Sequence, residues 1–378
     1  MNVLLIEPNF PIPVKSKNHS HFLPIGLLKI GSYHRSIGDH VKLVRGNVSK
    51  EAIGCKPDGI KITSLFTYWS KYVKESVVHY KSLYPTVPIE VGGIFASLMP
   101  KECKEITGCD VVSGGLYKNG TAENSEIDFS LLEDEIDYQI IHASRGCFRK
   151  CNFCGTWKIE PNVTYKKSIK DEIVKEKIVF YDNNILANPY IENILEELST
   201  HKINNKHITS ECQSGLDGRL LLLKPELASK LKNARFKNPR IAWDGPVKES
   251  KTIKKQITVL KKAGYKTNVK TTDMYIFMLY NFNTSYKDMC KKLEYCRRWG
   301  VLIIDCRYRP LNLLEDNYNP RKKVQNSNEY YIHKGWTDKQ VRSFRRKVRR
   351  QNIAIRLGLP NNRYIEGVEK GYVKIEGR

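Results

Sequence analysis

The first 120 residues alternate between short apolar runs and longer stretches with helical spacing. The apolar runs are rich in Val and Ile, which predicts buried strands at Val3–Ile6, Val41–Val44, Gly59–Ile62, Ile89–Val91 and Val111–Val112. Apolar residues three and four positions apart predict helices over Pro24–Ile37, Trp69–Leu83 and Lys101–Ile106. Strand–helix alternation of this kind predicts a doubly wound parallel sheet.

Two glycine pairs follow strands of this predicted sheet. Gly92-Gly93 and Gly114-Gly115 each come directly after a strand, at the edge where open α/β sheets bind ligands. A tight turn explains such a pair equally well. Residues 121–137 are polar and acidic, which is typical of a linker.

Strand–helix alternation resumes after the linker. Strands are predicted at Tyr138–Ala143, Ile178–Tyr181, Ile208–Cys212, Arg240–Trp243, Tyr275–Leu279 and Leu302–Asp305. The clearest amphipathic helices between them are Glu226–Lys232, Ile253–Lys262 and Tyr286–Trp299. Six such strand–helix units fit a partial (β/α)6 barrel, whose active site gathers at the carboxyl ends of the strands. The overall prediction is an α/β chain with domains at 1–120 and 138–320.

Residues 321–378 form a basic helical extension. Thr337 and Gln340 make a capping-box pattern, and Val341, Phe344 and Val348 then form one apolar stripe on a helix rich in Arg and Lys. Gly358 and Pro360 end this helix in the prediction.

Composition and net charge indicate the cellular compartment and the class of binding partner. The sequence has no run of about 18 apolar residues and its first residues lack the pattern of a signal peptide, so we expect a cytoplasmic protein without a membrane span. The 64 Lys and Arg against 40 Asp and Glu give a net charge of +24, which favours nucleic acid or another polyanion as partner. Abundant lysine also fits compositional drift, but drift does not explain the shortage of acids.

Three of the ten cysteines lie within eight residues. In the string HASRGCFRKCNFCGTW, Cys147, Cys151 and Cys154 are spaced C-x3-C-x2-C directly after a predicted strand. A close cysteine group in a reducing compartment indicates a metal site. Three thiolates leave one iron of a [4Fe–4S] cluster without a protein ligand, and an open site on a metal centre is where a substrate binds. A zinc knuckle is the alternative, but it needs a fourth ligand.

This cysteine spacing, with the aromatic Phe153 before the third cysteine, resembles the defining motif of the radical S-adenosylmethionine (SAM) superfamily. The resemblance covers roughly residues 138–310. It implies that the open iron chelates SAM and that a reductant such as flavodoxin or ferredoxin supplies an electron. SAM would then be cleaved to methionine and a 5′-deoxyadenosyl radical, which abstracts a substrate hydrogen atom.

The N-terminal 120 residues resemble the Rossmann-like, cobalamin-binding-type domain that precedes the barrel in one group of radical SAM enzymes. The resemblance is carried by VLLIEPNF, LPIGLLKIGSYHRSIGDHVKLV, PDGIKITSLF and PIEVGGIFASL. The D-x-H-x-x-G that supplies an axial histidine is absent, since Asp39 and His40 are adjacent. Members of this group bind cobalamin without that histidine or keep the domain without the cofactor, so both alternatives stand.

The resemblance also implies candidate SAM contacts. Gly155 lies beside the cluster loop, and FYDNN resembles an aspartate-rich strand end. Its Asp182 and Asn183 are expected near the SAM amino group. The remaining candidates follow the next strands and are Glu211, Gln213 and Asp244. For each polar residue a helix cap or a surface turn is an equal alternative. Cys290, Cys296 and Cys306 are candidates for an auxiliary cluster, although buried free thiols fit them better.

The positive charge of the chain indicates a class of substrate. An Arg-rich helix with Tyr330, Tyr331 and Trp336 upstream is able to follow a phosphate backbone and stack a base. We therefore expect a radical SAM enzyme that modifies a nucleic acid or nucleotide, for example by methylation or rearrangement. A peptide, protein or small-molecule substrate is the second alternative. A non-catalytic nucleic-acid-binding protein with a structural metal site is the third.

Overall fold

The computed structural model describes residues 1–12, 23–113, 122, 125–133, 135–267, 272–322 and 325–358. The chain forms two compact units. Unit 1 holds Met1–Ile136, Arg149–Pro161 and Arg309–Tyr318. Unit 2 holds Asp137–Phe148, Asn162–Tyr308 and Asn319–Arg378.

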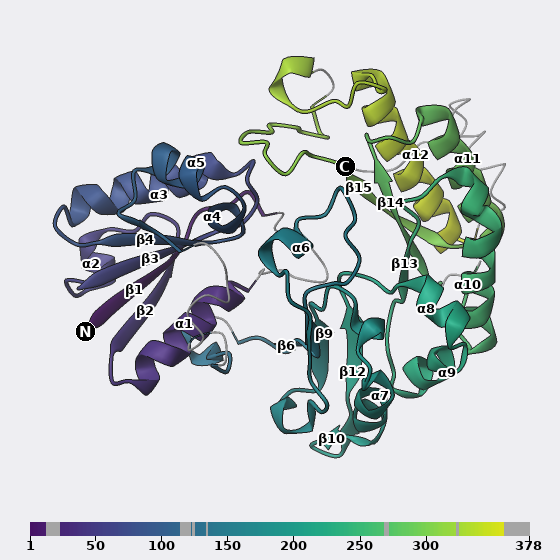
Figure 1. Cartoon of the computed structure of the whole chain (residues 1–378), viewed down its shortest axis with the longest axis horizontal. Helices are drawn as coiled ribbons and strands as arrows, with labels where there is room; N and C mark the ends of the chain where they lie inside the picture. The colour runs from purple at the N-terminus through teal and green to yellow at the C-terminus, as the bar shows by residue number, and fades with distance from the viewer. Residues whose placement is uncertain are drawn as a thin grey trace. The chain divides into compact units, whose positions relative to one another are not determined.

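Unit 1 is built on a parallel five-stranded sheet in the order β2-β1-β3-β4-β5. Its strands are β1 (Asn2–Glu7), β2 (His40–Arg45), β3 (Gly59–Ser64), β4 (Ile89–Gly93) and β5 (Val111–Val112). Its helices are α1 (Ile25–Ser36), α2 (Lys50–Ile53), α3 (Ser70–Leu83), α4 (Ile94–Leu98), α5 (Pro100–Thr107) and α6 (Thr156–Ile159). Figure 1 shows α1 on one face of the sheet and α3, α4 and α5 on the other.

The central strand β1 explains why this sheet needs helices on both sides. Val3, Leu4, Leu5 and Ile6 are successive residues and therefore point alternately to the two faces, yet all four are at most 4% exposed. An apolar strand of this kind is stable only when both faces are covered.

Unit 2 contains two three-stranded parallel sheets, in the orders β12-β9-β6 and β13-β14-β15. Their strands are β6 (Gln139–Ile141), β9 (Lys177–Phe180), β12 (Thr209–Cys212), β13 (Arg240–Ala242), β14 (Tyr275–Tyr280) and β15 (Leu302–Arg307). Parallel bridges join Ser210 to Phe236 and Leu216 to Ile241, so the region after β12 also runs beside β13. Two short hairpin pairs complete the strands: β7 (Ser144–Arg145) with β8 (Thr164–Tyr165), and β10 (Lys202–Ile203) with β11 (Lys206–His207).

The helices of unit 2 alternate with these strands in the chain, and the last helix follows the last strand, β15. They are α7 (Ile191–Thr200), α8 (Gly218–Leu223), α9 (Glu226–Asn233), α10 (Ser250–Lys262), α11 (Tyr286–Trp299) and α12 (Asp338–Arg356). Figure 1 shows α8 to α12 along one side of the strands. Helix α12 has the expected capping box, and its stripe of Val341, Phe344 and Val348 is fully buried.

The predicted strands and helices are therefore confirmed, with ends that shift by a few residues, and the chain is mixed α/β with parallel sheets. Helix α12 ends at Arg356, before Gly358. Gly114-Gly115, Pro360 and four positions of the 121–137 linker (121, 123, 124 and 134) lie outside the described residues. Within the described ranges, no helix is both long and apolar enough to cross a membrane.

Candidate metal centre

The three clustered cysteines lie on the loop that follows β7. Gly146 precedes Cys147 with a φ of +74°, a left-handed conformation that favours glycine. The cysteine Sγ atoms form no disulfide, and each residue is partly exposed. Partly exposed thiols without a disulfide are the donor chemistry that an iron–sulfur cluster requires, so the residues fit the expected group. The other glycine, Gly155, has no positive φ, and an added Cβ would make only ordinary 3.5 Å contacts, so the backbone does not require glycine there.

Along the chain, a boundary between the two units falls within this loop. Cys147 belongs to unit 2, while Cys151 and Cys154 belong to unit 1. In unit 1 the loop is held by short-range bonds: the Cys154 N–H donates to the Cys151 carbonyl (3.1 Å), and the Trp157 indole N–H donates to the same oxygen (3.2 Å). The Cys154 thiol donates to the Thr156 hydroxyl (3.3 Å). Nowhere in the described chain do three His, Cys, Asp or Glu side chains gather as a metal site.

Asp182 holds the strand end from which the cysteine loop starts. This residue, two positions after the end of β9, is 0% exposed. Its carboxylate accepts hydrogen bonds from the Ser144 hydroxyl (2.6 Å) and the Ala143 N–H (3.1 Å). Burial raises the pKa of Asp182 to about 6, and these hydrogen bonds oppose the rise. Asp182 therefore anchors the strand end that leads to Cys147, and its contact with SAM stays a prediction.

A polar face continues from this point across unit 2. In parallel ladders the paired residues share a face, so Ile140, Val179 and Glu211 lie on one side. In the β13-β14-β15 sheet, Phe277 shares a face with its partner Ala242. Leu279 lies on that same face with its partner Cys306. We define the polar face as the side chains His142, Tyr181, Glu211, Gln213, Arg240, Asp244 and Cys306. All of these except Arg240 are partly exposed.

The members of the polar face are linked to one another. The Glu211 carboxylate accepts hydrogen bonds from Gln213 (2.7 Å) and from the buried Arg240 guanidinium (3.2 Å). Arg240 also donates to the Cys212 carbonyl (2.5 Å). His142 lies 2.8 Å from the Arg145 guanidinium. The structure thus brings the predicted Glu211 and Gln213 together and adds Arg240, whose strand position gave no functional signal.

Asp244 lies next to a buried lysine that the sequence analysis did not single out. Burial raises the pKa of Asp244, and the nearby Lys292 ammonium opposes that rise. Lys292, on α11, is 0% exposed and donates to the Trp243 carbonyl (3.0 Å). Burial lowers the pKa of Lys292 to about 8. Lys292 therefore fixes the turn that carries Asp244. Asn183, the last predicted contact, is partly exposed beside Asp182.

The other cysteines are not brought together. Cys296 is buried on α11, on the side of the helices, whereas Cys306 belongs to the polar face. Burial raises the pKa of both thiols, that of Cys306 to about 12, so each remains a protonated thiol at neutral pH. Cys290 is partly exposed on α11.

Two aromatic residues expected to stack a base are buried instead. Tyr330 is 5% exposed and Trp336 is 6% exposed. The Trp336 indole N–H donates to the carbonyls of Phe282 (3.0 Å) and Thr284 (3.1 Å), and its ring packs against Phe344 of α12. These two rings hold α12 in place, so the expectation of base stacking is wrong for them; Tyr331 is partly exposed.

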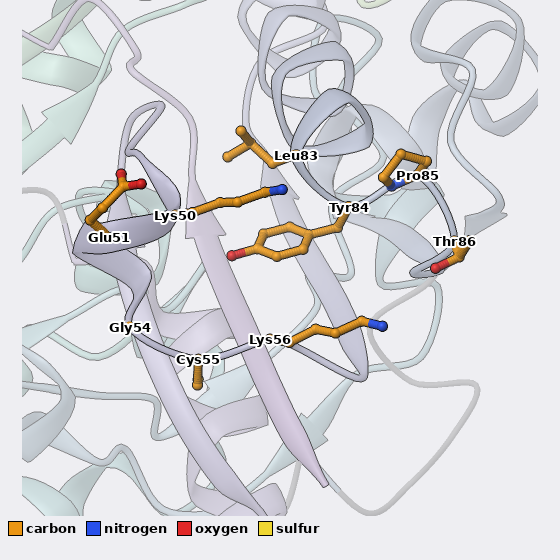
Figure 2. A pocket seen from close by; sticks show the side chains of 9 residues that line it. All are labelled: Lys50, Glu51, Gly54, Cys55, Lys56, Leu83, Tyr84, Pro85 and Thr86. Atoms are coloured by element: carbon orange, nitrogen blue, oxygen red, sulfur yellow. The ribbon is translucent and has the colours of Figure 1, made fainter.

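Unit 1 holds two further features at opposite edges of its sheet. At the carboxyl edge, Gly93 has a φ of +92°, and a Cβ there would lie 2.1 Å from the Ser64 carbonyl oxygen. Close packing therefore accounts for Gly93 without a ligand. At the amino ends of β3 and β4 lies an open cavity of about 720 Å³. Figure 2 shows the Tyr84 ring between Lys50 and Lys56 in this cavity. This edge is opposite to the one where α/β sheets bind ligands.

Comparison with known proteins gives no match to a family model and none to a curated protein. The family resemblance therefore rests on the residues quoted above.

Proposed function

We propose that this chain is a radical SAM enzyme with a [4Fe–4S] cluster held by Cys147, Cys151 and Cys154. The observation that carries the proposal is the C-x3-C-x2-C triplet of thiols without disulfides, on a glycine-shaped loop that follows β7 shortly after the carboxyl end of the parallel strand β6. When bound, the reduced cluster would supply the electron that cleaves SAM to methionine and a 5′-deoxyadenosyl radical.

The strand arrangement of unit 2 supports this proposal. Its six parallel strands follow one another in chain order with helices between them, and two bridges link the sheets. We infer a partial (β/α)6 barrel, which would place the cysteine loop and the polar face at the carboxyl end of the strands. Unit 1, with the strand order 2-1-3-4-5, is proposed as the Rossmann-like domain.

The chain's own residues have definable tasks in this proposal. Asp182 holds the strand end before the loop, and the Glu211–Arg240 pair presents polar atoms toward a bound ligand. Glu211, Gln213 and Asp244 are the proposed groups for the amino and hydroxyl groups of SAM. Unit 1 would hold cobalamin without an axial histidine or keep its fold without the cofactor, and the proposed SAM cleavage does not depend on which alternative applies.

The substrate is proposed to be a nucleic acid, because of the net charge of +24. We expect the protein to act as a cytoplasmic enzyme that uses a flavodoxin or ferredoxin as reductant.

Anaerobic reconstitution with iron and sulfide tests the first step. We expect about four irons per chain, broad visible absorption and formation of 5′-deoxyadenosine from SAM on reduction. The triple variant C147A/C151A/C154A should lose all three, whereas C290A/C296A/C306A is the control and should keep the iron. A colourless protein that binds zinc and leaves SAM intact would show a structural metal site instead. S-adenosylhomocysteine formed together with 5′-deoxyadenosine would indicate methyl transfer.

A further inference from the structure

Helices α10, α11 and α12 form a continuous basic surface on unit 2. They pack side by side: Lys254 of α10 lies over the Trp299 ring of α11 (5.9 Å), and Gln351 of α12 donates to the Leu293 carbonyl of α11 (3.1 Å). Tyr286 of α11 donates to Ser343 of α12 (3.0 Å). Figure 1 shows the three helices along the same side of the strands. We call the outward side of these helices the basic face.

The charge of the chain is concentrated in this surface. The three helices hold 18 Lys and Arg but only three Asp and Glu, so they supply 15 of the net charge of +24. Compositional drift would add lysine to all helices alike. Helix α7 of the same unit shows the opposite, since it has three Glu and no Lys or Arg. The distribution is therefore specific to α10–α12.

Helix α10 contributes lysines that its neighbours do not neutralise. Lys251, Lys254, Lys255 and Lys262 lie opposite the buried stripe of Ile253, Ile257 and Leu260, and all four are exposed. No carboxylate of the described residues lies within salt-bridge distance of these four lysines. A surface that only needs solubility mixes both signs of charge, because like charges four positions apart destabilise a helix.

Helix α12 shows which of its cations are structural. Arg342 is buried and pairs with Asp338 (2.8 Å), and Arg345 lies 3.6 Å from Asp305 of β15. Arg345 therefore pairs the helix with β15, whereas Arg342 ties the first turn of the helix to the preceding segment through the Lys322 carbonyl. Arg346, Lys347 and Arg349 point outward and are exposed, as are Lys287 and Arg298 on α11. Outward cations on all three helices thus face the solvent together.

The dimensions and chemistry of the basic face indicate the occupant. A helix of the length of α12 is about 28 Å long, and neighbouring helices lie about 8–10 Å apart. Rows of cations at this spacing come close to the width of the B-DNA major groove, which is about 12 Å, and A-form RNA offers a similarly wide minor groove between its phosphate backbones. Among the described residues, no large hydrophobic side chain of α10–α12 is fully exposed, and the partly exposed Trp299 and Tyr295 rings already lie under cations of Lys254 and Arg298. The face is therefore better suited to phosphates than to stacked bases.

We propose that the basic face binds the phosphodiester backbone of a double-helical nucleic acid, such as a duplex or the stem of a folded RNA, without reading its sequence. This inference rests on the proposed nucleic-acid substrate and names the surface that would hold it. The new element is α10, which lies outside the basic C-terminal extension and contributes on equal terms with α12.

Equilibrium binding to a labelled stem of about 16 base pairs tests the proposal at several salt concentrations. The variants are K251Q/K254Q/K255Q/K262Q on α10 and R346Q/K347Q/R349Q/R350Q on α12. The matched control is K71Q/K74Q/K101Q/K104Q, which removes four exposed lysines from α3 and α5 of unit 1. Each test variant should weaken binding and lower the slope of log K against log salt by about 2 to 4, whereas the control slope should stay within about 1 of the wild type.

The same slope in the α10 variant as in the wild type would overturn the proposal, and so would equal losses in all three variants. Tighter binding to a single strand than to the stem would overturn it too. Reductive SAM cleavage without added nucleic acid is measured in parallel on the reconstituted full chain. Stem binding without SAM cleavage would overturn the proposed enzyme but not the basic face. SAM cleavage without stem binding would do the reverse.

Discussion

The sheet of unit 1 and the β13-β14-β15 sheet of unit 2 are both parallel, but their central strands bury side chains differently. In β1 every residue from Val3 to Ile6 is buried, because helices cover both faces. In β14 buried residues alternate with partly exposed ones, and Phe277 and Leu279 lie on the uncovered side together with the exposed Ala242 of β13. A sheet covered on both faces has only its edges left for ligands. A sheet covered on one face keeps a whole face for polar chemistry.

The carboxyl edge of unit 1 gives the largest expected effect. Gly93→Ala places a Cβ 2.1 Å from the Ser64 carbonyl oxygen at a positive φ, so the backbone of β3 or β4 must move. We expect the free energy of unfolding to fall by about 4 kcal/mol, from strain and overpacking together. Gly92→Ala is the control, because its nearest atoms would lie at 3.9 Å, and it should cost less than about 1 kcal/mol. Urea unfolding measures both; similar losses would mean that this edge is not closely packed.

A pair of leucine truncations compares the two kinds of sheet directly. Leu5 of β1 is 0% exposed, whereas Leu279 of β14 is partly exposed on the uncovered side. Leu5→Ala should lower the free energy of unfolding by about 3 to 4 kcal/mol, since it leaves a cavity between the sheet and α1. Leu279→Ala should cost about 1 kcal/mol. Equal losses in chemical denaturation would show that the polar face of unit 2 is covered after all.

The buried carboxylate of Asp182 predicts a pH effect in unit 2. Because one pKa unit corresponds to about 1.4 kcal/mol, a pKa raised to about 6 means that ionised Asp182 costs on the order of 3 kcal/mol. A raised pKa gives stability that is present below the unfolded value and is lost as the pH rises through 6. The wild type should therefore lose about 3 kcal/mol relative to Asp182→Asn between about pH 4 and pH 7.

The difference between the two proteins cancels the titration of the other carboxylates, which makes Asp182→Asn its own reference. A difference that stays constant over this range, measured by denaturation at each pH, would mean that Asp182 is solvated. The Gln139 side chain offers a second control, because Gln139→Ala removes a buried polar group of the same sheet that does not titrate.

The sequence predicted the helices and strands better than it predicted which side chains share a face of a sheet. The run NVLLIE and the Thr337–Gln340 box act locally, so β1 and α12 were predicted within a residue or two. The grouping of Glu211 with Arg240 depends on the register between strands 29 positions apart, which no local pattern contains. Lys292 shows the same limit, since a Lys-Lys pair on a helix indicates a solvated surface, yet Lys292 is buried against Trp243.

The clustered cysteines could be recognised from the sequence, whereas the basic face could not. The spacing of Cys147, Cys151 and Cys154 is a property of the chain and could be recognised at once. The basic face is not, because α10 and α12 are about 90 residues apart and become neighbours of α11 only in the fold. Tyr330 and Trp336 misled the prediction because aromatic residues beside a basic helix fit a base-stacking site and a helix anchor equally well.

The smallest expected effect comes from a substitution that lowers the stability of α12 without changing its charge. Thr337→Ala removes the hydroxyl that accepts the Gln340 N–H (3.3 Å), so the free energy of unfolding should fall by about 1 kcal/mol. Thr258→Ala on α10 is the matched control, because that hydroxyl only donates to the Lys254 carbonyl within the helix, and it should change stability by less than about 0.5 kcal/mol. Since neither substitution alters charge, both variants should bind a nucleic-acid stem as the wild type does. If Thr337→Ala weakened stem binding as much as the loss of four arginines and lysines, the order of the helix rather than its charge would determine binding.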